Sequence, residues 1–326
     1  MKIPSYNGKK TLALACLACT ALLGLLPLAA SGAELAASPR KARLRLLFAN
    51  SLVQDINRDD ARSAFKLWVE TVGRNHGLLL EAETDSYDRL EEVEKRLREK
   101  TLDLVIFTTM DYLQLGEDGP LQPVFSPIRS QEALFDVYVL LTRRDRNLTT
   151  LSALRGRSVA FRQHGANLGR LWLEVTLGES SFGSVNDFFG TKSDVTKPSS
   201  VVLPVFFGKF DAGVVNRSIL ETMCEMNPQL GTQLQVLTNS AALSEGVICL
   251  HRDYAEARAD VLAGLADLHT DPRGQQLLLM FKMSKLLPFK PEYLDGVRDL
   301  KAREIKLGTP SQGKAALTAA GGEPKL

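Results

Sequence analysis

Residues 158–175 (SVAFRQHGANLGRLWLEV) have the types and spacing that could form a ligand site. An apolar run at 159–161 predicts a buried strand, and apolar residues at helical spacing over 168–175 predict a helix. The start of a helix presents free backbone N–H groups and the positive end of the helix dipole, which suits an anion or a polar ligand. The turn before the helix carries Arg162, Gln163, His164 and Asn167. We predict a ligand site at this turn, although an ordinary strand-to-helix connection has the same pattern.

Motifs for catalysis or metal binding are missing from the sequence. It has no G-x-S-x-G turn, no H-E-x-x-H and no phosphate-binding P-loop. The histidines are His76, His164, His251 and His269. They do not have metal-ligand spacing, and only His164 lies in the predicted site turn. We therefore expect no catalytic residues, no metal and no cofactor. An exported enzyme is a competing class, which a nucleophile–base pair in the ligand cleft would support.

The N-terminal segment has the three-part form of a secretory signal peptide. Lysines begin it, residues 11–28 form an apolar run, and small residues precede Glu34. We expect cleavage near Ala33; the alternative is a retained membrane anchor, because the apolar run approaches spanning length. Cleavage would leave about 290 residues, enough for one large or two medium domains.

The charge pattern indicates the kind of partner, and the distribution of apolar runs bears on the compartment. The formal net charge is +2, with basic and acidic residues interspersed. A nucleic-acid partner would require a concentrated basic face, so we expect none. No second apolar run is long enough to span a membrane. We expect a monomeric periplasmic protein.

Two cysteines, Cys224 and Cys249, would remain after cleavage. Outside the cytoplasm they could pair and close a loop of moderate length. They could equally be two separate buried thiols that pack as small apolar groups. The sequence does not decide between these alternatives.

Alternating strand and helix patterns predict an α/β protein. The predicted strands include 43–50, 78–82, 102–107 and 133–142, and the helices between the first three are 59–73 and 87–100. This order is typical of a parallel sheet with helices on its faces. Residues 116–127 are rich in Gly and Pro and predict a loop. A second strand-helix-strand pattern follows 133–142, so we expect two lobes.

Four short motifs occur in a characteristic order: residues 84–90 (TDSYDRL), 102–112 (LDLVIFTTMDY), 154–160 (LRGRSVA) and 208–214 (GKFDAGV). This order resembles that of the phosphate/phosphite/phosphonate-binding periplasmic components of ABC importers, over about residues 43–300. The resemblance implies the type 2 periplasmic binding protein fold. In that fold each of two α/β lobes is a mixed, mostly parallel sheet flanked by helices, and the ligand lies between the lobes.

The resemblance also implies ligand-binding residues. Tyr87 would reach into the cleft, and Thr108 and Thr109 would supply backbone and side-chain donors. Asp211 would meet an amino or hydroxyl group of the ligand, or a partner residue. Each has a structural alternative: Tyr87 could be a packing residue, the two threonines could end their strand, and Asp211 could shape its turn.

The second-lobe helix departs from the family pattern. Phosphonate-binding members begin this helix with a hydroxyl-rich Ser-Thr-Ser-Gly segment, and the matching residues here are 166–169, Ala-Asn-Leu-Gly. Each lost donor would cost on the order of 1–3 kcal/mol for a buried phosphonate oxygen. Asn167 keeps a polar side chain, and Arg162, Gln163 and His164 could offer replacements. The resemblance therefore supports the fold better than the phosphonate specificity.

We expect a signal peptide over 1–33, a first lobe from 42–135 and 250–305, a second lobe over 136–249 and a disordered tail over 307–326. The expected function is a periplasmic solute-binding protein that closes around a small anionic, phosphonate-like or phosphate-like ligand and presents it to an ABC permease. The alternative is a ligand-sensing protein that feeds a membrane signalling receptor, with altered or lost phosphonate binding. A structural protein with a filled cleft is a third class.

Overall fold

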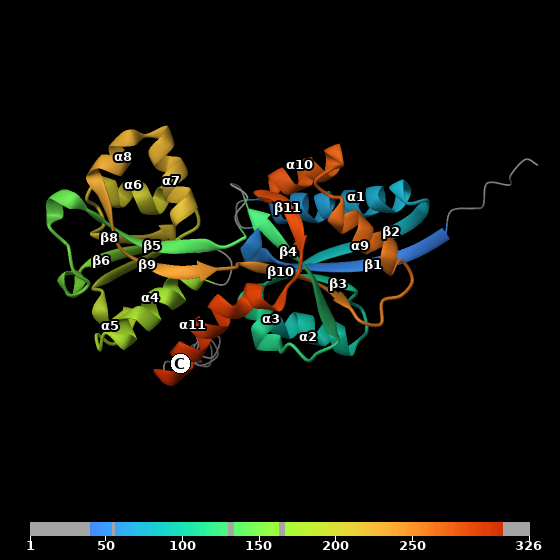
Figure 1. Ribbon diagram of the computed structural model, residues 1–326, viewed down its shortest axis with the longest axis horizontal. Helices are drawn as coiled ribbons and strands as arrows, with labels where there is room; N and C mark the ends of the chain where they lie inside the picture. Colours follow the sequence, from blue (N-terminus) through green and yellow to red (C-terminus); the bar gives the residue numbers. More distant parts are fainter. Residues whose placement is uncertain (1–39, 54–55, 130–133, 163–166, 309–326) are drawn as a thin grey trace, which may run out of the picture. The chain divides into compact units, whose positions relative to one another are not determined.

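The strands of the protein form two separate sheets, one of six strands and one of five (Figure 1). The structure is a computed structural model and describes residues 40–53, 56–129, 134–162 and 167–308. The expected signal peptide, 1–33, and most of the expected tail, 307–326, lie outside the described residues. The strand orders are β11-β4-β10-β3-β1-β2 and β7-β6-β8-β5-β9.

Each sheet takes its strands from chain segments that the sequence assigns to one lobe, except that residues 246–249, expected in the second lobe, lie in the first sheet. The first sheet contains β1 (Arg40–Ala49), β2 (Leu78–Tyr87), β3 (Leu104–Thr108), β4 (Leu121–Arg129), β10 (Gly246–His251) and β11 (Met283–Pro288). The second contains β5 (Asp136–Arg143), β6 (Ser158–Arg162), β7 (Thr191–Val195), β8 (Ala212–Asn216) and β9 (Leu234–Leu243). The chain therefore passes from the first sheet to the second between Arg129 and Asp136, and it returns to the first sheet at 244–245.

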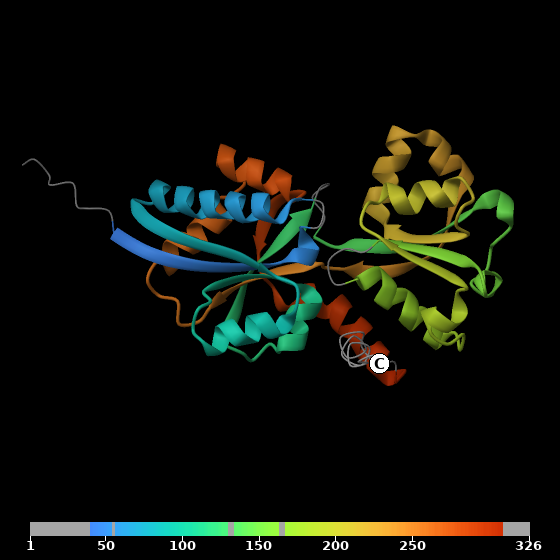
Figure 2. The same cartoon turned by 180° about the vertical axis from the view of Figure 1, so that it is seen from behind.

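Helices cover both faces of each sheet (Figures 1 and 2). The first sheet has α1 (Arg58–Asn75), α9 (Arg258–Ala266) and α10 (Pro272–Met280) on one face, and α2 (Leu90–Arg98) and α3 (Thr109–Leu115) on the other. The second sheet has α6 (Ser199–Phe206), α7 (Arg217–Met226) and α8 (Pro228–Gln233) on one face, and α4 (Leu168–Glu179) and α5 (Val185–Phe188) on the other. Four apolar cores result, one for each sheet face. This is the α/β architecture of two lobes that the sequence predicts.

Both sheets are mixed, with less parallel pairing than expected. Only four of the nine strand pairings in the described residues are parallel. The antiparallel pairings involve β4, β5, β9, β10 and β11. These include the strands next to the crossings, where the chain enters the neighbouring sheet in the opposite direction. The expectation of mostly parallel sheets is therefore wrong.

The strand β4 lies largely within residues 116–127, which the sequence predicts to be a loop. It pairs with β10 on one side and β11 on the other, although it contains Pro123 and Pro127. Its pairing with β10 is irregular between Ile248 and Cys249. Proline removes a backbone donor, so a strand with two prolines needs such a local break in the ladder.

The last helix, α11 (Asp295–Lys306), does not return to the first lobe as expected for 250–305. Its buried residues Val297 and Leu300 belong to the core on the α4 face of the second sheet. It also forms an ion pair with the first lobe, where Arg298 Nε donates to Glu117 Oε1 at 2.9 Å. The assignment of 250–305 to one lobe is therefore wrong at its C-terminal end.

In the part of the chain that the structure describes, no helix is long and apolar enough to cross a membrane. Cys224 and Cys249 both carry free thiols, so the disulfide considered above does not form. The reason is their placement: Cys249 lies in β10 within the core of the first lobe, and Cys224 lies in α7 of the second.

We predict that thiol titration of the exported protein finds two reactive cysteines after unfolding, without prior reduction. In the folded state Cys224 should react first, because it is partly exposed whereas Cys249 is fully buried. A Cys224→Ser variant controls for the assignment. Detection of fewer than two thiols under denaturing, non-reducing conditions would contradict the placement of these residues.

Candidate functional site

A chain of buried polar contacts begins at the carboxyl ends of the parallel strands β6 and β8. Arg162 and Asn216 are the last residues of these strands, and Arg162 Nη1 donates to Asn216 Oδ1 at 3.2 Å. Asn216 Nδ2 in turn donates to Glu245 Oε1 at 2.9 Å. All three residues are buried. Ligands of open α/β sheets usually bind at the carboxyl ends of the strands, so this is the candidate site.

The contacts continue to the strand that enters the second lobe. The hydroxyl of Tyr138, in β5, donates to the same Glu245 Oε1. Glu245 itself lies on the crossing between β9 and β10. Arg162, Asn216, Glu245 and Tyr138 together are called the crossover network below. It joins the second sheet to one of the segments that connect the lobes.

Residues of the first lobe also form hydrogen bonds with the crossing at 244–245. The backbone N–H of Thr109 donates to the carbonyl oxygen of Glu245 at 3.1 Å, and its hydroxyl donates to the carbonyl oxygen of Ser244 at 2.9 Å. Ser244 Oγ donates to the carbonyl oxygen of Tyr293 at 2.8 Å. The crossing at 244–245 is therefore fixed by hydrogen bonds from both lobes.

Tyr87, Thr108 and Thr109 are buried inside the first lobe. The Tyr87 hydroxyl donates to Asp111 Oδ2 at 2.9 Å, and the ring meets Phe107 edge-on with a centroid distance of 6.2 Å. Thr108 Oγ1 accepts from the backbone N–H of Asp111 and so caps α3. Burial raises the pKa of Tyr87 well above its ordinary value, as does the neighbouring Asp111. These contacts favour the structural alternatives for Tyr87 and Thr108, whereas Thr109 holds the crossing at 244–245.

Asp211 is placed at the wrong end of the second sheet for ligand binding. Its Oδ2 accepts from the backbone N–H of Ser158 at 3.0 Å and from the Ser158 hydroxyl at 2.8 Å. Ser158 begins β6 and Arg162 ends it, so the two lie roughly 13 Å apart at about 3.3 Å per residue. Asp211 thus joins the starts of two neighbouring strands, which favours the structural alternative in which it shapes its turn.

The remaining predicted residues lie at the turn before α4. Asn167 precedes the helix in the left-handed backbone region, with φ of 52°. This conformation is tolerated better by Asn than by most residues. Gln163 and His164 lie outside the described residues. Of the predicted site residues, Arg162 and Asn167 thus remain at the carboxyl end of the second sheet.

A cavity of about 60 Å3 lies beside the crossover network. It has apolar and aromatic walls, including Phe48, Phe65 and Phe281, and Asp136, Ser218 and Glu245 supply its polar groups. A single water needs roughly 10–15 Å3 by the same measure, so a small organic group fits. Burial raises the pKa of Asp136 above its ordinary value, and the charge of Glu245 adds to this, while the Ser218 hydroxyl lowers it.

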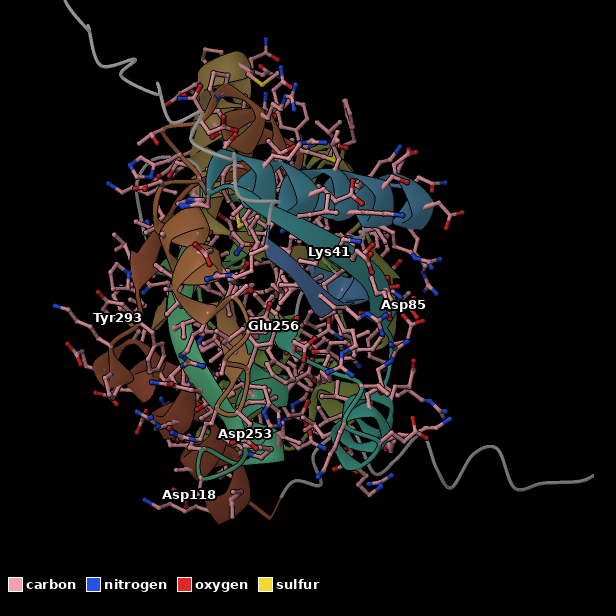
Figure 3. All side chains as sticks on the ribbon, turned by 90° about the vertical axis from the view of Figure 1, so that its right-hand side faces the viewer. Lys41, Asp85, Asp118, Asp253, Glu256 and Tyr293 are labelled. Atoms are coloured by element: carbon pink, nitrogen blue, oxygen red, sulfur yellow. The ribbon has the colours of Figure 1, made fainter. Side chains whose placement is uncertain are left out.

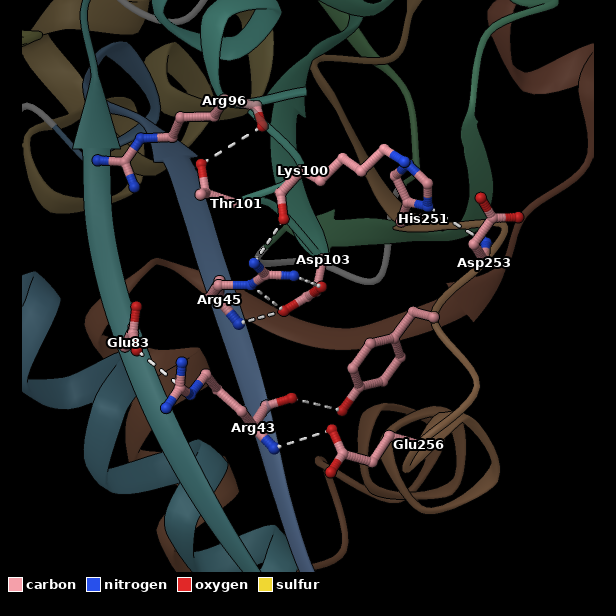
Figure 4. A network of polar contacts seen from close by, with 11 residues as sticks. Arg43, Arg45, Glu83, Arg96, Lys100, Thr101, Asp103, His251, Asp253 and Glu256 are labelled. Carbon is pink, nitrogen blue, oxygen red and sulfur yellow. Dashed lines mark hydrogen bonds and ion pairs between the residues drawn. The ribbon is translucent and has the colours of Figure 1, made fainter. Parts of the chain in front are cut away.

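A larger open depression of about 940 Å3 lies at the amino ends of β1 and β3. Its most buried charges are paired: Arg45 Nε donates to Asp103 Oδ2 at 2.8 Å (Figure 4). The backbone N–H of Arg45 donates to the same oxygen at 2.8 Å. Because these groups hold two strands together, the depression is a weaker candidate than the cavity at the carboxyl ends.

Sequence reasoning missed most of the polar residues at this site. Tyr138, Asn216 and Glu245 of the crossover network and Asp136 and Ser218 of the cavity were not predicted. Their positions in the sequence could have indicated some of them. Asn216 directly follows a short apolar run, and Glu245 stands between two predicted strands. Among the described residues, no cluster of His, Cys, Asp or Glu could hold a metal ion.

The family comparison agrees with this architecture. Residues 53–294 match the model of the ABC transporter phosphonate periplasmic substrate-binding proteins. The chain belongs to this family. Its members are periplasmic proteins that bind small-molecule ligands and work with an ABC permease. None of the curated protein sequences is a significant match.

Solved structures similar to this chain have the same two-lobed fold. A Xanthomonas citri protein bound to ATP has a TM-score of 0.61 and 17% identity, covering 82% of this chain and 98% of that chain. A binding component of a Pseudomonas aeruginosa phosphonate ABC transporter has a TM-score of 0.57 and 12% identity, with coverage of 85% and 93%. PhnD1 of Prochlorococcus marinus with methylphosphonate has a TM-score of 0.56 and 16% identity, with coverage of 82% and 98%. At these identities the likeness concerns the fold alone.

The first prediction at this site concerns Gly169, whose position lets α4 pack closely on Tyr138. A Cβ at Gly169 would lie 2.5 Å from Tyr138 Cδ1 and 2.9 Å from Val214 Cγ1. We expect Gly169→Ala to lower the free energy of unfolding by roughly 1–3 kcal/mol, as overpacking does. Urea denaturation measures the change. Gly119→Ala is the control, because its new Cβ would meet only one atom, at 3.6 Å. Equal midpoints for both variants would contradict this packing.

The second prediction concerns Tyr87. Tyr87→Phe should lower the free energy of unfolding by roughly 1–3 kcal/mol, because it leaves the half-buried Asp111 carboxylate without one hydrogen-bond donor. It should not alter the affinity for any ligand that the protein binds. Tyr293→Phe, at a partly exposed tyrosine, is the control. A loss of ligand affinity with unchanged stability would instead support the role in the cleft that the family resemblance implies.

Proposed function

We propose that the protein is the solute-binding component of an ABC importer and that its two lobes close on a small ligand by bending at the crossings. The observation that carries this proposal is the crossover network. In this network, buried polar groups of the second lobe contact the crossing at 244–245. A change in the orientation of the lobes would alter the backbone at this crossing. Hinge closure of this kind is a standard response of two-domain proteins to a ligand.

We further propose that the protein acts as a monomer, without catalysis, after removal of the signal peptide near Ala33. The family consists of substrate-binding proteins, which supports a binding role. N-terminal sequencing of the protein purified from the periplasm tests the cleavage site. A sequence that begins well before Glu34 would favour the retained anchor.

The anionic ligand expected from the sequence is supported by Arg162. A guanidinium can hold a carboxylate or phosphate group through two hydrogen bonds. Against it stand the buried placement of the two threonines and the missing hydroxyl-rich segment before α4. These departures favour the second candidate function, a protein that senses an altered ligand and feeds a membrane signalling receptor.

A thermal-shift screen of the exported protein tests the proposal. The panel contains phosphate, phosphite, phosphonates, sulfate, carboxylates, amino acids and small organic amines. A ligand at about 100 times its dissociation constant should stabilise the folded state by about 2.7 kcal/mol. If an oxyanion binds at Arg162, Arg162→Gln should abolish the shift, and Arg89→Gln, at a side chain that is 76% exposed, should preserve it. The absence of a shift with any compound would contradict the importer proposal and favour a sensing or structural role.

A further inference from the structure

The cavity beside the crossover network has a continuous aromatic wall. Phe65 packs against Phe48 with ring centroids 4.9 Å apart, and it stacks on Phe281 with centroids 4.4 Å apart. All three side chains are buried and line the cavity. Aromatic faces carry partial negative charge, so such a wall suits an apolar or a cationic group.

The lining of the same cavity also contains two acidic residues. Asp136, at the start of β5, and Glu245 both line it. Asp136 Oδ2 accepts from Ser218 Oγ at 2.7 Å, and its Oδ1 accepts from the backbone N–H of Val137 at 2.8 Å. An ionised carboxylate has about four acceptor positions, so Asp136 can accept further hydrogen bonds from a ligand.

The lining carries no opposing charge in the part of the chain that the structure describes. Among those lining residues there is no Lys, Arg or His. Burial already raises the pKa of Asp136, and the nearby Glu245 adds to that effect. A cation beside Asp136 would relieve this unfavourable environment, whereas an anion beside Asp136 would raise its pKa further.

We propose that this cavity binds the ammonium group of a small organic amine, with its nitrogen against Asp136 and its alkyl part against the phenylalanine rings. The inference rests on the proposed function, since it assigns a ligand class to the solute-binding site. The ammonium donates charge-assisted hydrogen bonds to the carboxylate, and the rings add a cation–π contribution. The volume limits the inserted part to a short alkyl chain.

The test measures binding of n-propylammonium to the exported protein by calorimetry at neutral pH, with n-propanol and n-propylphosphonate as neutral and anionic analogues. We expect n-propylammonium to bind at least about tenfold more tightly than n-propanol, as a charge-assisted bond predicts. Asp136→Asn keeps the shape of the side chain and should weaken this binding by about tenfold or more. Asp118→Asn, at an exposed carboxylate of the first lobe (Figure 3), should leave it unchanged.

A second variant covers the case in which Asp136→Asn does not fold. Phe281→Leu keeps an apolar side chain but removes one aromatic face, and it should weaken n-propylammonium binding by roughly twofold to tenfold. The inference is overturned if n-propylammonium does not bind the natural protein, or binds Asp136→Asn equally well. Binding of n-propylphosphonate alone overturns it while leaving the importer proposal intact. If no compound of the thermal-shift screen or of the calorimetry series binds, both the amine inference and the importer proposal are overturned.

Discussion

The buried guanidinium of Arg162 imposes the constraint on which the centre of this protein depends. A charge taken out of water is costly unless a partner compensates it. Here Asn216 lies between Arg162 and Glu245, accepting a hydrogen bond from one and donating to the other. The Glu245 carboxylate belongs to the crossing between the lobes. Compensation of the Arg162 charge in the second sheet therefore helps to fix the path of the chain into the first sheet. Changing either charge alone would leave the other buried and less well compensated.

The same constraint shapes what the site can recognise. Glu245 serves the crossover network and also faces the cavity, where Asp136 is its acidic neighbour. Here the basic group, Arg162, lies within the crossover network, and carboxylates line the aromatic cavity. This arrangement differs electrostatically from a site that binds a phosphonate. The missing hydroxyl-rich segment before α4, visible in the sequence, points in the same direction. Family membership and ligand class are therefore separate conclusions for this chain.

The sequence predicts what depends on local periodicity. The first α/β units and the strand at 133–142 follow from apolar patterns, and the two lobes follow from their order. It fails for β4, because a segment rich in Gly and Pro predicts a loop. Only the pairing with the neighbouring strands shows that this segment forms a strand. It also fails for the crossover network, since residues 138, 162, 216 and 245 become neighbours only when the sheets form. The motif around Asp211 predicts that this residue stands beside a strand, but it does not predict at which end of the sheet.

The helix α11 shows why bending should be centred on the crossings. Its apolar residues Val297 and Leu300 pack in the second lobe, whereas Arg298 pairs with Glu117 of the first lobe. The Arg298 and Glu117 side chains are 32% and 40% exposed, and a solvent-exposed ion pair contributes only about 0–1 kcal/mol. Breaking the hydrogen bonds that Asn216 and Tyr138 donate to the buried Glu245 would leave its side chain unsatisfied, which costs about 1–3 kcal/mol. A change in lobe orientation should therefore separate Arg298 from Glu117 and keep the crossover network intact as the pivot.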